Sequence, residues 1–203
     1  MRWGMVIDTK KCIGCRACVI ACKAEQGTPP DIFFGDLVQM EVGKGKTTRR
    51  IWVPKPCMHC EDPLCLKACP TGATQQREDG IVWVDQEKCM GCRACMEACP
   101  YEVRFYFGKE SPKYYYEEGP MPYELQMEKK WGARQGTVIK CNLCMHLLDE
   151  GKEPACVATC LTGCRIVGDL DDPDSEVSKM ITIKQATQLK PEAGTSPRAY
   201  YIF

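Results

Sequence analysis

The sequence lacks features on which several large classes of protein depend. Its 27 basic and 27 acidic residues give a formal net charge of zero, so no electrostatic argument for binding nucleic acid or an anionic membrane follows. No apolar run approaches the roughly 18–20 residues of a membrane-spanning helix. The N-terminus has no apolar signal core, so we expect no signal peptide of the chain's own.

Signatures of catalysis are missing as well. The 203 residues contain no G-x-G-x-x-G motif, no phosphate-binding P-loop and no pattern pairing a nucleophile with a base. We therefore expect no catalytic residues, and a chain that is not itself an enzyme.

Cysteine, in contrast, is abundant, with 17 residues, of which 16 fall into four runs. Runs one and three have the spacing C-x2-C-x2-C-x3-C, run two C-x2-C-x4-C-x3-C and run four C-x2-C-x11-C-x3-C. Only Cys164 is left over. The members are Cys12, Cys15, Cys18 and Cys22 in run one; Cys57, Cys60, Cys65 and Cys69 in run two; Cys89, Cys92, Cys95 and Cys99 in run three; Cys141, Cys144, Cys156 and Cys160 in run four.

This spacing is typical of [4Fe–4S] ligation. Three closely spaced thiolates wrap one face of a cube, and the fourth, three residues on, begins a short helix that leads to a second cube. The runs must then work in pairs, each pair holding two clusters. Structural zinc prefers two cysteine pairs separated by a longer hairpin, and only run four has such a gap. Disulfides and simple packing are also disfavoured, because adjacent x2 cysteines bridge poorly and 16 of 17 are in register.

An internal repeat indicates which runs pair. Residues 8–22 and 85–99 are identical at 10 of 15 positions, at an offset of 77, and runs two and four also resemble each other. Runs one and two are one possible pair. However, the 19 residues between Cys69 and Cys89 match the separation in an ordinary two-cluster ferredoxin, with a turn at 78–80 and an alternating strand over 81–84.

The sequence therefore predicts an inner module of runs two and three (57–99), nested in an outer module of runs one and four (1–56 and 100–203) that includes insertions and a tail. The fold class is α+β, with short helices and two-stranded sheets, and the tail, 165–203, is expected to wrap a partner. We name four ligand sets: set A is Cys12, Cys15, Cys18 and Cys160; set B is Cys141, Cys144, Cys156 and Cys22; set C is Cys89, Cys92, Cys95 and Cys69; set D is Cys57, Cys60, Cys65 and Cys99.

The chain resembles a known family at several motifs. They are G-M-V-I-D at 4–8, C-M-H-C-E-D-P-L-C at 57–65, C-P-Y at 99–101, P-A-C-V-A-T-C at 154–160, G-D-L-D-D-P-D-S at 168–175 and L-K-P-E-A-G-T-S-P-R at 189–198. They are similar to the four-cluster iron–sulfur subunit of molybdopterin oxidoreductases of the dimethyl sulfoxide reductase family, especially polysulfide, thiosulfate, tetrathionate and arsenate reductases. The proline that often follows runs one and four is absent, and 108–138, with Trp131, looks like an insertion.

The resemblance implies a partner carrying molybdenum or tungsten bis-pterin (bisPGD) near cluster A and a membrane quinone-reactive subunit near cluster D. It favours the periplasmic over the cytoplasmic face of the membrane and a role in anaerobic respiration. We thus expect an electron-transfer subunit with four [4Fe–4S] clusters held by the 16 cysteines. A free polyferredoxin or a hydrogenase-type subunit is the alternative.

Five residues outside the ligand sets have candidate supporting roles. Cys164 is expected to be a small buried residue beside a cluster. His59 and His146 are expected to position a site rather than ligate iron, since every cluster already has four cysteines. Arg16 and Arg93 occupy equivalent places beside cluster loops, where a charge would stabilise a reduced cluster; a solvated arginine explains them equally well.

Overall fold

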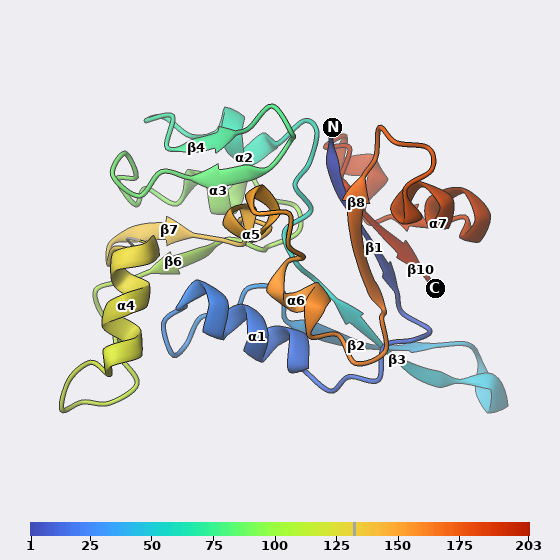
Figure 1. The fold of residues 1–203 in the computed structure, drawn as a ribbon, viewed down its shortest axis with the longest axis horizontal. Coiled ribbons are helices and arrows are strands. Elements are labelled where there is room, and N and C mark those ends of the chain that lie inside the picture. The colour runs from blue at the N-terminus through green and yellow to red at the C-terminus, as the bar shows by residue number, and fades with distance from the viewer. Residues whose placement is uncertain (132) are drawn as a thin grey trace.

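The computed structural model describes residues 1–131 and 133–203, and for Trp131 only its backbone. Short helices and strands are mixed along the chain, as expected for an α+β fold (Figure 1). The helices are α1 (Ala17–Gln26), α2 (Leu64–Lys67), α3 (Ala94–Glu97), α4 (Pro122–Trp131), α5 (Met145–Asp149), α6 (Ala155–Ala158) and α7 (Glu176–Lys184), with 3₁₀ turns at Gly45–Thr47 and Pro191–Ala193. The strands are β1 (Trp3–Asp8), β2 (Leu37–Val42), β3 (Arg49–Pro54), β4 (Thr74–Gln76), β5 (Val82–Val84), β6 (Phe105–Phe107), β7 (Thr137–Ile139), β8 (Arg165–Asp169), β9 (Thr187–Gln188) and β10 (Ala199–Ile202).

The two ends of the chain meet in a four-stranded sheet with the order β8-β1-β10-β9. Strand β1 pairs in parallel with β10 and antiparallel with β8. Val6 packs with Val177 of α7 on one face, whereas Met5 and Ile7 enter the main core on the other, because side chains alternate along a strand. The tail, 165–203, thus folds onto its own N-terminal strand, and the expectation that it also wraps a partner stays a prediction.

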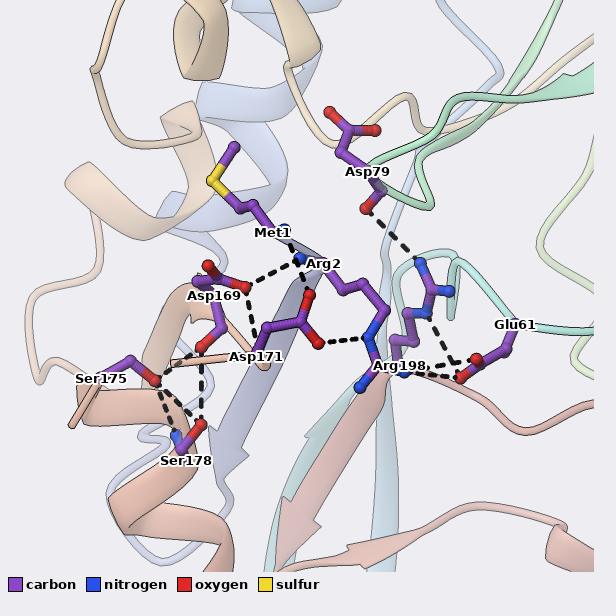
Figure 2. Close-up of polar contacts among 9 residues, drawn as sticks. All are labelled: Met1, Arg2, Glu61, Asp79, Asp169, Asp171, Ser175, Ser178 and Arg198. Atoms are coloured by element: carbon purple, nitrogen blue, oxygen red, sulfur yellow. Dashed lines mark hydrogen bonds and ion pairs between the residues drawn. The ribbon is translucent and has the colours of Figure 1, made fainter. Parts of the chain in front are cut away.

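Polar contacts tie this sheet to run two (Figure 2). The Arg2 guanidinium pairs with Asp171 at 2.6 Å and with Glu61 at 3.2 Å. The N-terminal amino group reaches the same Asp171 at 3.1 Å. Glu61 follows Cys60 directly, so the start of β1 is anchored beside a cysteine loop.

Two-stranded antiparallel sheets form from β2–β3, β4–β5 and β6–β7 in the described chain. The predicted strand over 81–84 is present as β5, and Gly80 has a φ of 85°, a left-handed conformation that suits glycine at the predicted turn. Helices α2 and α3 contact each other in one part of the molecule, and α1 and α6 in another (Figure 1). One core that includes Ile7, Ile51 and Val157 joins these parts.

The insertion, 108–138, folds against the chain itself through α4. Lys130 on α4 pairs with Glu25 on α1 at 2.9 Å, and the Tyr114 hydroxyl donates to Glu128 at 3.0 Å. The side chain of Trp131 in this insertion lies outside the described residues. No described helix has both the length and the apolar character to span a membrane.

Candidate iron–sulfur cluster sites

The opening of every cysteine run contains residues in the left-handed backbone region. Gly14 and Arg16 in run one have φ of 72° and 60°, and Gly91 and Arg93 in run three repeat them at 73° and 64°. His59 in run two (42°) and both Leu143 and Cys144 in run four (55° and 49°) are also left-handed. Non-glycine residues adopt this backbone region at a cost in free energy, and residues strained in this way are concentrated at functional sites. These turns curl each loop tightly, and all 17 cysteines carry free thiols.

The predicted members of set D line one small cavity together. Cys57, Cys60, Cys65 and Cys99 surround it, closed by Tyr101 and Arg104 among other residues. Burial raises the pKa of Cys60 to about 12 although the Thr195 hydroxyl opposes this, and neighbouring thiols raise it further. Such crowded thiols are disfavoured as free anions but become thiolates when a cluster binds them.

The members of set C line a second small cavity. Cys69, Cys89, Cys92 and Cys95 surround it, again with Arg104 at its wall. Cys69 belongs to run two and the other three to run three. The structure therefore brings the last cysteine of each of these runs to the other run's loop.

Cys22 of run one lies among the first three cysteines of run four. Burial raises its pKa well above the ordinary value, and the nearby thiols of Cys141, Cys156 and Cys144 raise it further. Gln26 donates to the Cys144 sulfur at 3.4 Å. The four predicted members of set B are thus neighbours.

Set A is assembled less closely. Cys12 and Cys18 pack in one apolar cluster. The Cys160 and Cys164 sulfurs are 3.5 Å apart, and Cys164 also interacts with Cys12. Cys15 is exposed on the same loop. Cys164 itself is buried beside this set, as predicted, and burial raises its pKa.

Backbone N–H groups point at several of the sulfurs. The N–H of Thr74 donates to Cys69 at 3.4 Å, and that of Cys164 to Cys160 at 3.3 Å. Burial acts to raise the pKa of Cys69 and Cys160. The hydrogen bonds to these sulfurs, including those from Thr71 and Thr162, outweigh burial, so the pKa of each thiol falls to about 7. Donors of this kind hold thiolates and tune cluster potential. The cavities and donors fit [4Fe–4S] clusters, which would supply one-electron redox chemistry.

Side chains also link sets B and D. Burial is the main cause that raises the pKa of Cys141 to about 12, and the nearby Cys57 thiol adds to it. The buried Lys140 donates to the backbone carbonyls of Val82 and Cys141, the latter at 2.6 Å. His59 lies beside Cys141 of set B and is not a member of any of the four ligand sets.

The other candidate residues lie at the rims. His146 contacts Glu25 at 2.7 Å. Arg16 pairs with Asp36 at 2.7 Å, and Arg93 stacks over Tyr106, 4.8 Å from the ring centre.

Sequence reasoning missed the buried Arg104, Lys140 and Arg165. One usable signal was present: Arg104 and Arg165 each stand five residues after the last cysteine of a run.

Two family models for 4Fe–4S dicluster domains match the chain. One covers residues 48–114 and again 113–170, and the other covers 11–73. Two such domains give four clusters, in agreement with the four cysteine runs.

Curated relatives cover essentially the whole chain. It is 39% identical to a selenate reductase subunit of Mesobacillus selenatarsenatis, over 100% of the chain and 72% of the relative. It is 36% identical to the arsenate respiratory reductase iron–sulfur subunit of Shewanella, over 100% and 96%. It is 38% identical to a tetrathionate reductase subunit of Salmonella typhimurium, over 99% and 72%.

These relatives are iron–sulfur subunits of reductase complexes. The cysteine sites match that role, since fully ligated cubes leave no open position for substrate. The chain therefore belongs to the four-cluster iron–sulfur subunits of the dimethyl sulfoxide reductase type, which transfer electrons within a reductase complex and are not its catalytic subunit.

Proposed function

We propose that the chain conducts electrons along a line of four clusters held by sets A, B, D and C, in that order. The proximity of Cys57 to Cys141 carries this order, because it makes sets D and B adjacent. Cys18 and Cys156 interact, which makes sets A and B adjacent. Arg104 lies at the walls of both the set C and set D cavities.

This order gives the line two exposed ends. Cys15 of set A and Cys92 of set C are exposed, and each loop presents an apolar residue to solvent, Ile13 and Met90, which are 62% and 67% exposed. We therefore place set C, rather than the set D expected from the resemblance, at the end that faces the second redox partner.

The nested arrangement of modules is part of the same proposal. The inner module is supported by two cavities that are each lined by cysteines from both run two and run three. The outer module is supported by Cys22 of run one, which lies among Cys141, Cys144 and Cys156 of run four.

The catalytic partner in this proposal carries a molybdenum or tungsten pterin and docks beside set A. A membrane quinone-reactive subunit docks beside set C. The relatives support this: several are subunits of selenate, arsenate or tetrathionate reductases, and others are iron–sulfur subunits of a menaquinone reductase and a menaquinol oxidoreductase. We propose the periplasmic face for the complex, as the resemblance favours.

Paired cysteine substitutions test the ligand sets. Nested pairing predicts that Cys22→Ser and Cys141→Ser each remove the same cluster, so the double variant loses no more iron than either single one, about 4 per chain. Cys22→Ser combined with Cys160→Ser should remove two clusters. If the first double variant loses two clusters, the nested pairing fails.

Isolation of the native complex tests the partners. Anaerobic purification should yield a large pterin-containing subunit and a membrane subunit with this chain, and protease added to intact spheroplasts should reach it. A stable monomer would instead favour a free polyferredoxin, and a hydrogenase active site in the partner would favour the hydrogenase-type complex.

A further inference from the structure

Two arginines are buried without a carboxylate partner. Arg104 and Arg165 are 4% and 3% exposed. Within the described residues, neither has an acidic group at ion-pairing distance, and two guanidinium nitrogens of each have no hydrogen-bond partner. An isolated buried cation is expensive, so proteins rarely keep one without a compensating anion.

The surroundings of Arg104 consist of cysteines from two ligand sets. Arg104 shares the wall of one cavity with Cys57 and Cys65, and the wall of a second cavity with Cys95. Cys65 and Cys57 are members of set D, and Cys95 is a member of set C. One nitrogen donates to the Thr74 hydroxyl at 2.7 Å, which fixes the guanidinium between the two cavities.

Arg165 has the same relationship to the other two sets. The guanidinium interacts electrostatically with Cys156, Cys18 and Cys164, and Cys164 directly precedes Arg165 in the chain. Cys156 is a member of set B and Cys18 of set A, whereas Cys164 contacts Cys160 of set A. Each proposed pair of clusters thus has one buried arginine between its members.

The sequence positions of the two arginines are equivalent within each pair of runs. Arg104 follows Cys99 by five residues and Arg165 follows Cys160 by five, and the fifth residue after Cys69 and Cys22 is Thr74 and Gly27. Arg165 opens β8, and Arg104 directly precedes β6. In each pair of runs, the fifth residue after the last cysteine is an arginine in one run and a smaller residue in the other.

We propose that Arg104 and Arg165 are positioning residues that each place one fixed positive charge between the two clusters of a pair and raise the reduction potential of both. The proposal rests on the ligand sets proposed above. A cluster ligated by four thiolates is anionic and becomes more so when it accepts an electron, so a nearby cation favours the reduced form. Because the charge is buried, water screens it little.

A redox titration of the complete complex, monitored by electron paramagnetic resonance, tests this. Signals are first assigned with Cys69→Ser (set C), Cys99→Ser (set D), Cys22→Ser (set B) and Cys160→Ser (set A). In Arg104→Met the reduction equilibrium constants of clusters C and D should fall about tenfold, equivalent to about 59 mV for a one-electron couple, with A and B unchanged. In Arg165→Met the reduction equilibrium constants of clusters A and B should fall about tenfold, with C and D unchanged.

Arg198→Met is the matched control. Arg198 is also buried, but it faces Glu61 and the Asp79 carbonyl rather than a cysteine (Figure 2). Its substitution should affect stability and leave all four potentials in place. Arg104→Lys and Arg165→Lys keep the charge and should restore the potentials.

Unchanged potentials in iron-replete Met variants would overturn the proposal, and so would equal shifts of all four clusters. If a Met variant fails to load iron, the Lys variant decides: full loading with near wild-type potentials supports the role of charge, and an equal loading failure overturns it. If two signals shift but they are not those assigned to the predicted pair, the ligand sets fail while the role of the arginine stands.

Discussion

The Nε2 atom of His59 lies 3.9 Å from the sulfur of Cys141, although 82 residues separate them in the sequence. The backbone N–H of Val82 donates to Nδ1 at 3.0 Å, so the proton of the neutral ring is on Nε2 and faces the sulfur. Burial lowers the pKa of His59 well below its ordinary value, and Lys140 and Arg198 lower it further. The ring is therefore an uncharged donor that joins run two to run four.

Replacing His59 should lower the potential of the cluster that Cys141 ligates. A hydrogen bond contributes about 0.5–1.5 kcal/mol net, so His59→Leu should reduce the reduction equilibrium constant of that cluster by up to about tenfold. His59→Gln, which retains an N–H donor, is the control. The measurement is a redox titration with iron quantified beside it; an unchanged potential in the Leu variant would show that the contact does not act on the cluster.

The ion pair between Arg77 and Asp149 should make the contact between the β4–β5 turn and α5 sensitive to acid. Arg77 reaches both carboxylate oxygens, at 2.9 and 2.6 Å, and lowers the pKa of Asp149. A lowered carboxylate pKa adds stability above the ordinary pKa of about 3.9, and this is lost as pH falls. Such exposed pairs contribute about 0.2–1 kcal/mol.

Arg77→Gln should therefore lower the thermal midpoint near pH 7, and the difference from wild type should shrink as pH falls below about 4. Lys152→Gln, which breaks the exposed pair with Glu150, is the comparison at a site that does not bridge the turn and the helix. A difference that is constant with pH would mean that Arg77 acts through packing rather than through charge.

Cys164 should be dispensable for cluster content. Its sulfur contacts Cys160, but the four ligand sets are complete without it. Cys164→Ala should keep about 16 iron per chain and lower only the potential of cluster A, because one S–H donor to its ligand is lost. Loss of about 4 iron would instead make Cys164 a ligand and require set A to be redrawn.

Tyr201 should contribute measurably to the fold. It is fully buried, and its hydroxyl donates to the Pro54 carbonyl at 2.9 Å, which ties β10 to β3. Tyr201→Phe leaves that carbonyl without its partner and should cost about 1–3 kcal/mol in unfolding free energy. Tyr116→Phe, at an exposed tyrosine, should stay within about 0.5 kcal/mol of wild type. Equal stability of the two variants in denaturant unfolding would contradict this.

The cysteine spacing predicted the cluster content because ligation depends on local geometry. The repeat of residues 8–22 at 85–99 reappears in the backbone as matching left-handed residues, such as Arg16 and Arg93. The strand at 81–84 was also predictable, since its alternation is local.

Long-range contacts were beyond the sequence pattern. The residue pattern of β1 does not indicate that this strand pairs with Ala199–Ile202, at the other end of the chain. Likewise, a lone arginine carries no pattern, so the position of Arg165 between two sets of cysteines becomes visible only once runs one and four meet in space.

The most direct test of the four-cluster account is to quantify iron, acid-labile sulfide and zinc in the anaerobically purified complex, per copy of this chain and after subtracting metal held by its partners. The account predicts about 16 iron and 16 sulfide with no zinc, from four cubes with four cysteines each. About 4 zinc without sulfide would contradict electron transfer by this chain, and about 8 iron would mean that only two of the four sets hold clusters.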